Sequence, residues 1–235
     1  MRNEGKESKD MLKPQTKQQY SRGAQNIITD EYQVIRLSEG CPHKCPWCRE
    51  WREFGRDEWK VFPIPEIVRN EIRITDMNLI AKPEALSMIE AFKDIRVDGK
   101  VIYPWLVCGI DYRFLTAEIA KALHESRFKN IHIAWDLRYS DQKKIKKAVD
   151  MLKRVGYRDI SIFMVCNHPA VSYRENCKKL NLCKYWGVKV NDCWFDNQTS
   201  PNIEPIAWTF EQIKKFRSAV RKHNQIVNFG IDPEL

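Results

Sequence analysis

Short apolar runs alternate with amphipathic segments over most of the chain, and this alternation constrains the fold more than any other feature. The runs are rich in branched and aromatic residues and begin about 28 to 39 residues apart, which fits a strand, a crossover helix and two short loops. They cover residues 33–37, 72–76, 101–108, 131–136, 160–166 and 188–194, with a further run at 226–231. Because parallel neighbours are joined only by crossovers, the pattern predicts an α/β fold with parallel strands.

The segments between the later runs have apolar residues three and four apart, which is typical of amphipathic helices. Helices are predicted at residues 116–128, 141–155, 172–186 and 210–223. Six such units could form a doubly wound sheet or curl into a partial (βα)6 TIM-like barrel, whereas a closed barrel needs eight. In either fold, ligands bind at the carboxyl ends of the strands, so the polar residues after each run are the candidate site.

The apolar content is sufficient for one sizeable core, so a single domain is expected over residues 29–235, with a C-terminal helix and strand. Residues 1–28 are polar and show neither a helical stripe nor strand alternation. We expect them to form a flexible or peripherally docked tail.

No apolar stretch at the N-terminus resembles a signal peptide, and the longest mostly apolar run, at 102–110, is too short to cross a membrane. The expected location is therefore the cytoplasm. In that reducing compartment, closely grouped cysteines more often bind a metal or do chemistry than form disulfides.

The first strand runs into Gly40-Cys41-Pro42-His43-Lys44-Cys45-Pro46-Trp47-Cys48, a C-x3-C-x2-C arrangement. Glycine and proline favour a curled loop in which three thiols surround a soft metal centre. Zinc would need a fourth ligand, such as His43 or a distant cysteine. A four-iron cluster would instead leave one iron without a protein thiolate, where a substrate or cofactor could bind.

The C-x3-C-x-aromatic-C pattern after the first strand resembles the radical S-adenosylmethionine (SAM) superfamily. Further segments resemble a subset of its small, uncharacterised members: residues 76–79, 108–116, 131–136 and 167–168. The resemblance implies a partial (βα)6 barrel and a [4Fe-4S] cluster held by Cys41, Cys45 and Cys48. It also implies that SAM binds the fourth iron and is cleaved reductively to a 5′-deoxyadenosyl radical that acts on an unknown substrate.

The resemblance also suggests residues that bind SAM. Trp47 stands where the family places an aromatic ring against the adenine. Asp76-Met77-Asn78 replaces the usual Gly-Gly-Glu element, so Asn78 could accept the methionyl amine through its carbonyl. The remaining candidate cofactor-binding residues follow later strands: Asp111, Arg113, Asp136 and Asn167.

The three aspartates have a second interpretation. Asp76, Asp111 and Asp136 end successive strands and should converge on one mouth of the sheet, where carboxylates can hold ribose hydroxyls or a positive charge. Aspartate is equally a favoured N-cap of the helix that follows a strand.

A second set of cysteines, Cys166, Cys177, Cys183 and Cys193, suggests an auxiliary cluster. Cys177 and Cys183, however, are six residues apart on a predicted helix and would face about 240° away from each other. Buried free thiols are the alternative.

The balance of 40 Lys and Arg against 31 Asp and Glu gives a net charge of +9. Residues 141–158 hold seven Lys and Arg, and residues 211–222 hold five. These faces could bind nucleic acid or another macromolecule, or could simply be solvated.

The expected partners are an external electron donor of the flavodoxin or ferredoxin type and an unknown, possibly macromolecular, substrate. Two rival functions remain, a zinc-stabilised nucleic-acid-binding module and a non-catalytic iron-sulfur protein.

Overall fold

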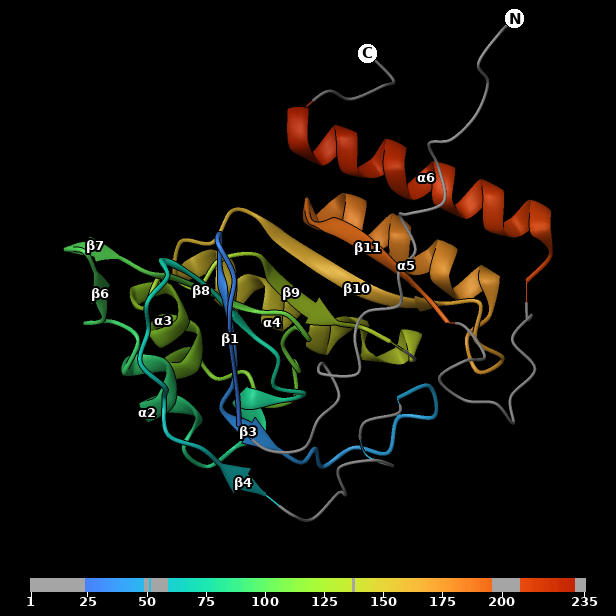
Figure 1. The fold of residues 1–235 in the computed structure, drawn as a ribbon. Coiled ribbons are helices and arrows are strands. Elements are labelled where there is room, and N and C mark those ends of the chain that lie inside the picture. Colours follow the sequence, from blue (N-terminus) through green and yellow to red (C-terminus); the bar gives the residue numbers. More distant parts are fainter. Residues whose placement is uncertain (1–23, 49–50, 52–58, 137, 196–207, 231–235) are drawn as a thin grey trace, which may run out of the picture.

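The computed structural model describes residues 24–48, 51, 59–136, 138–195 and 208–230. Two sheets with parallel strands form its centre (Figure 1). In the first, β2 (Gln33–Arg36), β5 (Glu71–Ile74) and β8 (Tyr103–Leu106) run parallel in that order. In the second, β9 (Ile131–Ala134), β10 (Ile160–Cys166) and β11 (Lys189–Trp194) also run parallel. The prediction of an α/β fold with parallel strands is confirmed.

The two sheets meet at an isolated parallel bridge between Ile110 and Ile133. Ile110 N–H donates to His132 O at 2.6 Å, and Ala134 N–H donates to Ile110 O at 3.0 Å. The bridge places the end of β8 beside β9, so the carboxyl ends of both sheets lie along one edge.

Three further pairings extend this framework. β1 (Gln25–Ile28) runs antiparallel to β2 and forms the outer strand of the first sheet. β3 (Ser38–Glu39) pairs with β4 (Lys60–Val61), and β6 (Arg96–Val97) pairs with β7 (Lys100–Val101), both antiparallel. The last four residues of the expected flexible or peripherally docked tail, 25–28, form this outer strand. Residues 1–23 lie outside the described residues.

Helices lie on the outer sides of the sheets. Figure 1 shows α2 (Ala85–Glu90), α3 (Ala117–Glu125) and α4 (Gln142–Arg154) on one flank, and α5 (Tyr173–Trp186) and α6 (Phe210–Phe229) beside β10 and β11. Two short 3₁₀ turns, η2 (Leu79–Ala81) and η3 (Tyr139–Asp141), precede α2 and α4. The core between sheets and helices includes one fully buried residue from each of five strands: Ile35, Ile74, Ile133, Ile162 and Val190.

The four predicted helices are present within a few residues of their expected bounds, and α6 extends further than expected. Thr116, Ser172 and Thr209 cap α3, α5 and α6 through their hydroxyl groups. The predicted strand at 226–231 is wrong, because α6 continues to Phe229 and ends at Gly230 in a left-handed conformation. No helix in the described part of the chain has both the length and the apolar character needed to span a bilayer.

Candidate active site

The three cysteines of the first loop line a single cavity. After β3 the chain turns through residues 40–48, where Cys48 N–H donates to Cys45 O at 3.0 Å and Trp51 Nε1 donates to the same oxygen at 2.9 Å. Cys41, Cys45 and Cys48 are partly exposed and line a cavity of about 230 Å³, termed the cysteine cavity here. Burial, with the charges of Asp136 and the other two cysteines, raises the pKa of Cys45 to about 12. The neutral thiol is therefore favoured near neutral pH, and a bound metal ion would favour the thiolate.

A buried lysine holds the start of this loop. Lys82, only 4% exposed, follows η2 and donates from Nζ to Glu39 O at 2.6 Å and to Gly40 O. Burial lowers the pKa of Lys82, while the nearby Asp76 and Cys41 oppose that shift. The ammonium group thus fixes the backbone immediately before Cys41.

Asp111 links three other side chains of the site. Its carboxylate lies 2.7 Å from His43 Nε2 and accepts from Asn78 Nδ2 at 2.9 Å. Arg113 donates to it from Nε at 2.7 Å, from Nη2 at 3.0 Å and from its backbone N–H at 3.1 Å. Burial would raise the pKa of Asp111, but the bonds and charge of Arg113 and the bond from Asn78 outweigh it and hold the pKa below its usual value. The carboxylate therefore stays ionised and orients its neighbours.

Asn78, which lines the cysteine cavity, has a buried hydrogen-bond acceptor without a partner among the described residues. Its Nδ2 donates to Asp111 and lies 3.9 Å from Cys41 Sγ. Its Oδ1 is buried and has no hydrogen-bond partner among the described residues. Because a buried acceptor without a partner is costly, this oxygen indicates a site for a donor on a ligand.

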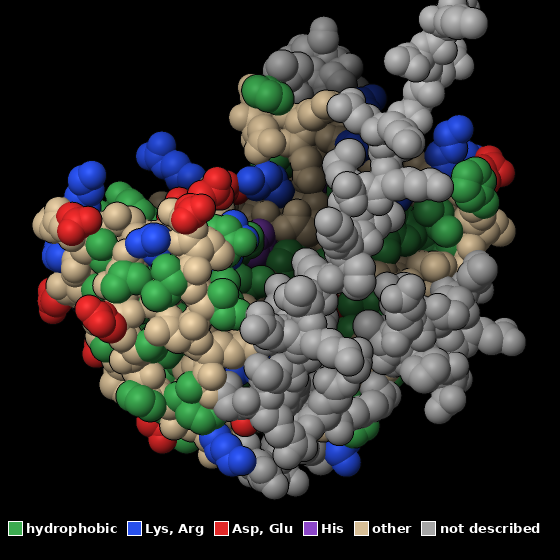
Figure 2. Space-filling view, viewed as in Figure 1, with side chains coloured by type: hydrophobic (Ala, Val, Ile, Leu, Met, Phe, Trp, Pro, Cys, Tyr) green, Lys and Arg blue, Asp and Glu red, His purple; other side chains and the backbone are tan. Residues whose placement is uncertain are grey.

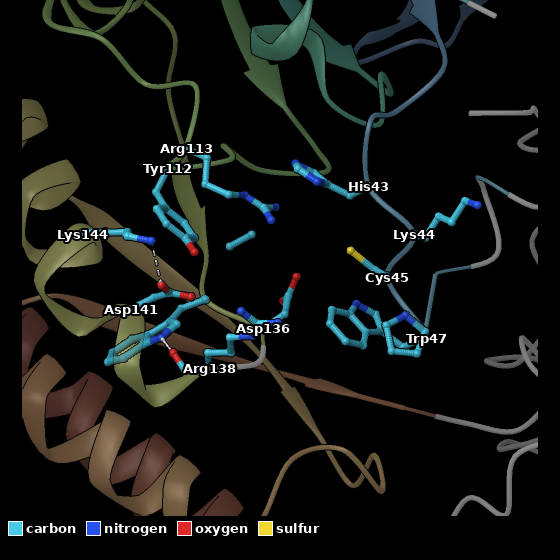
Figure 3. A pocket seen from close by; sticks show the side chains of 13 residues that line it. His43, Lys44, Cys45, Trp47, Tyr112, Arg113, Asp136, Arg138, Asp141 and Lys144 are labelled. Carbon is cyan, nitrogen blue, oxygen red and sulfur yellow. Dashed lines mark hydrogen bonds and ion pairs between the residues drawn. The ribbon is translucent and has the colours of Figure 1, made fainter. Parts of the chain in front are cut away.

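A second cavity of about 330 Å³, termed the strand-end cavity here, adjoins the first and shares six of its lining residues. Figure 3 shows Arg113 and Asp136 directed into the space between Tyr112 on one side and Cys45 and Trp47 on the other. The shared residues are His43, Cys45, Trp47, Arg113, Ala134 and Asp136. The two cavities thus form one cleft at the carboxyl ends of β8 and β9.

Asp136 has an unusual protonation equilibrium in this cleft. Burial raises its pKa to about 6, although the charges of Lys179 and Arg113 oppose the shift. Lys179 is fully buried on α5 and donates from Nζ to Trp135 O and Asp136 O, both at 3.1 Å. Burial also lowers the pKa of Lys179 to about 8. The lysine fixes the end of β9, and with it the position of the Asp136 side chain.

Trp47 lies at the boundary of the two cavities and is partly exposed. Its ring packs edge-to-face with His168 at a centroid distance of 5.6 Å, and His168 packs against Phe195 at 4.6 Å. These contacts fix the orientation of a flat ring beside the cysteines, an arrangement suited to stacking on a planar ligand.

Two of the residues expected at the site line neither cavity. The buried Asp76 accepts from Leu37 N–H at 2.9 Å and from the Ser38 hydroxyl, and burial raises its pKa to about 6. Asn167 accepts from Trp208 N–H at 3.3 Å. Both side chains make hydrogen bonds between chain segments. The alternative that the aspartates cap the following helices does not hold for Asp111 and Asp136 either, because Thr116 and Asp141 occupy those positions.

The structure adds two residues that the sequence did not indicate as part of the site. Cys108, just after β8, lines the cysteine cavity together with the three loop cysteines. His43, which the sequence suggested only as an alternative zinc ligand, bonds Asp111 and lines both cavities. The sequence signal that could have indicated Cys108 as a site residue is its position three residues before the candidate residue Asp111.

The described residues contain no group of three or more His, Cys, Asp or Glu side chains positioned to hold one metal ion. In a four-iron cluster each thiolate binds a different iron, so cysteines that hold such a cluster need not converge on one ion. In the second cysteine set, Cys166 and Cys183 are buried, and Asn176 Nδ2 lies 3.5 Å from Cys166 Sγ.

The basic helices neutralise part of their charge internally. Ion pairs join Lys144 to Asp141 at 3.2 Å, Lys146 to Asp150 at 2.6 Å and Lys215 to Glu211 at 2.7 Å. On the face shown in Figure 2, Lys and Arg side chains are interspersed with Asp and Glu.

The fold is similar to that of a radical SAM methyltransferase, TsrM from Kitasatospora setae. One TsrM structure, with cobalamin and a [4Fe-4S] cluster bound, matches 67% of this chain and 36% of its own at 11% identity and a TM-score of 0.54. Another, with tryptophan substrate and the SAM analogue aza-SAM, matches 68% and 36% at 11% identity and a TM-score of 0.55. This chain therefore spans about a third of the length of those enzymes. No protein-family model and no curated protein matches it. At this identity, the likeness concerns the fold.

Proposed function

We propose that the chain is a radical SAM enzyme that holds a [4Fe-4S] cluster and SAM in the cleft at its strand ends. The observation that supports this most is that Cys41, Cys45 and Cys48 line one cavity together with Asn78, whose buried Oδ1 has no hydrogen-bond partner among the described residues. The parallel-strand fold, similar to that of a radical SAM methyltransferase, supports the same function. In this proposal the two sheets form one partial (βα)6 barrel, joined at the bridge between Ile110 and Ile133.

The residues present fit both groups. The three thiolates would each bind one iron, and Asn78 Oδ1 would accept a hydrogen bond from the amino group of the methionyl moiety. Trp47 would stack on the adenine, and Asp136 would accept hydrogen bonds from ribose hydroxyls. The chemistry that the two groups supply when bound is reductive cleavage of SAM to methionine and a 5′-deoxyadenosyl radical, which abstracts hydrogen from a substrate.

The chain's own contribution is to bind, orient and exclude solvent. Asp111 fixes Asn78, Arg113 and His43 through charge-assisted hydrogen bonds. The Arg113 guanidinium, directed into the cleft in Figure 3, would bind the carboxylate of the methionyl group. Holding the reacting carbon beside a substrate hydrogen is the largest advantage that such a site can give.

The proposed function also implies an electron donor, a substrate and a cellular compartment. A flavodoxin- or ferredoxin-type donor would supply the electron, and a macromolecule could complete the substrate pocket. All eight cysteines lie in the described part of the chain and none forms a disulfide, which supports a reducing compartment such as the cytoplasm.

Anaerobic reconstitution with iron and sulfide, followed by dithionite and SAM, tests the proposal. We expect about four irons per chain and formation of 5′-deoxyadenosine and methionine, measured by chromatography. Cys45→Ala should abolish both products, whereas Cys177→Ala, on α5 outside both cavities, should retain them. Four irons without 5′-deoxyadenosine would favour a non-catalytic iron-sulfur protein, and one zinc per chain would favour a zinc-stabilised module.

A further inference from the structure

We propose that Cys108 is a fourth, exchangeable ligand of the cluster, which binds the remaining iron in the absence of SAM and is displaced when SAM binds. The inference rests on the proposed function and extends it, because it assigns a ligand to the one iron that the loop cysteines leave open.

The position of Cys108 supports this role. Four of the eight cysteines of the chain line the cysteine cavity, and three of them come from the loop at 40–48. The fourth, Cys108, comes from a separate segment just after β8, where its Sγ lies 3.8 Å from Thr75 O. Its side chain is exposed. The cavity is therefore bounded by thiols from two separate segments of the chain.

Neighbouring contacts fix the backbone around Cys108. Gly109 N–H donates to Leu106 O at 3.1 Å, and Ile110 pairs with β9 across the bridge between the sheets. Three residues after Cys108, Asp111 accepts a hydrogen bond from Asn78 Nδ2, which itself lies 3.9 Å from Cys41 Sγ. One continuous set of contacts thus connects the segment that carries Cys108 with the first loop cysteine.

The chemistry of the donor set suits a four-iron cluster. Thiolate is the usual protein ligand of such clusters, and four are needed to complete the coordination. On binding iron, the Cys108 thiol would lose its proton to solvent, and no electron would be transferred. When SAM binds, its amino and carboxylate groups would bind the same iron in place of the thiolate, and the released thiolate would take up a proton from solvent.

Two consequences follow from this competition. A protein thiolate on the fourth iron would protect the cluster from loss of iron while SAM is absent. It would also weaken the apparent affinity for SAM, because each SAM molecule must displace the thiolate. Removal of Cys108 should therefore tighten SAM binding and make the SAM-free cluster less stable.

The test uses the reconstituted full chain, with Cys108→Ala and Cys108→Ser beside the wild type and Cys177→Ala as control. Mössbauer and electron paramagnetic resonance spectra of the SAM-free cluster should differ between the wild type and both Cys108 variants. With saturating SAM, the spectra of all four proteins should coincide. The SAM dissociation constant should be severalfold lower in the Cys108 variants than in the wild type and the control.

Alkylation gives an independent readout. Iodoacetamide should label Cys108 in the cluster-free protein and fail to label it in the SAM-free, cluster-loaded protein. After denaturation and removal of the cluster, Cys108 should be labelled to the same extent in both preparations. Equal labelling of Cys108 in the two forms, or SAM-free spectra identical in wild type and variants, would overturn the proposal.

The outcomes separate this inference from the proposed function. If the wild type assembles a cluster that shows ligation by Cys108 but does not respond to SAM, the exchange is refuted and the enzyme function fails with it. If SAM is cleaved while Cys108 stays reactive in the loaded protein, the enzyme function stands and only the fourth ligand is refuted.

Discussion

At the scale of single residues, the site depends on charges held at fixed points by the backbone. Asp111 is the clearest case, because its ionised carboxylate orients His43, Asn78 and Arg113 at once. Two buried lysines fix the backbone instead of side chains. Lys82 donates to a backbone carbonyl at the start of the cysteine loop, and Lys179 donates to one at the end of β9. The cysteine loop and Asp136 are positioned by these groups more than by regular secondary structure.

Lys82→Met tests this for the loop. The change removes the only buried ammonium group that the described contacts place on Glu39 O and Gly40 O, and leaves both carbonyls without that donor. We expect the free energy of unfolding of the cluster-free protein to fall by about 1–3 kcal/mol. Because the backbone before Cys41 loosens, the reconstituted variant should also retain less iron. Urea denaturation and iron analysis measure the two effects.

The matched control is Lys121→Met, whose side chain is 70% exposed on α3 and pairs with Glu125 at 3.7 Å. An exposed pair of this kind contributes little, so its stability should change by less than about 0.5 kcal/mol. Equal losses in the two variants would show that Lys82 acts only as a general surface charge.

Residue roles could be predicted from the sequence only in part. The motif and the strand ends indicated that Trp47, Asn78, Asp111, Arg113 and Asp136 belong near the cysteines, and these residues do line the cleft. Asp76 also ends a strand, but its side chain turns toward Leu37 N–H. Position at a strand end does not determine which way a side chain points, because successive side chains alternate between the two faces.

At the scale of elements, α6 protects the edge of the second sheet. β11 is the outer strand there, and Asn224 on α6 bonds both backbone groups of Val190, accepting from its N–H and donating to its carbonyl, each at 2.8 Å. His223 Nε2 lies 2.8 Å from Val188 O. Helix side chains thus replace the hydrogen bonds of a further strand.

This arrangement explains why the last prediction of a strand is wrong. Residues 226–231 form an apolar run that is compatible with either a buried strand or a helix, and local sequence does not separate the two. The tertiary contacts of α6 with β11 decide in favour of the helix, since they supply the hydrogen bonds that the strand edge needs.

Asn224→Ala should therefore destabilise the second sheet. Val190 would lose a partner for both its N–H and its carbonyl, so we expect a loss of about 1–3 kcal/mol in the free energy of unfolding, measured by urea denaturation. Hydrogen exchange of the Val190 amide should become faster. Gln225→Ala, at the adjacent exposed position of the same helix, should leave both quantities unchanged. Unchanged exchange at Val190 in the Asn224 variant would contradict the role assigned to α6.

At the scale of the whole molecule, two three-stranded parallel sets, joined by one bridge, form the wall of the cleft. Strand order within each set follows sequence order, and the strands of each set run parallel, as the alternation of strands and helices predicted. The addition of β1 and the break between β8 and β9 were not predictable, because each depends on backbone pairing between segments without a distinctive sequence pattern. The junction between the sheets is also where Cys108 and Asp111 enter the site.

Gly109 is the residue on which this junction most depends. Its φ of +82° is a left-handed conformation, and an added Cβ would lie 3.1 Å from His132 O and 3.3 Å from the Phe163 ring. Gly109→Ala should lose about 1–2 kcal/mol from backbone strain alone. The crowding against β9 should add to this loss and displace Asp111, so SAM binding to the reconstituted protein should weaken as well.

Gly99→Ala is the matched control, because Gly99 has a similar φ of +73° but no atom within 4 Å of the added Cβ. That variant should show the strain cost in urea denaturation and bind SAM like the wild type. If both variants lose equal stability and bind SAM equally well, close contact at the junction does not position the site.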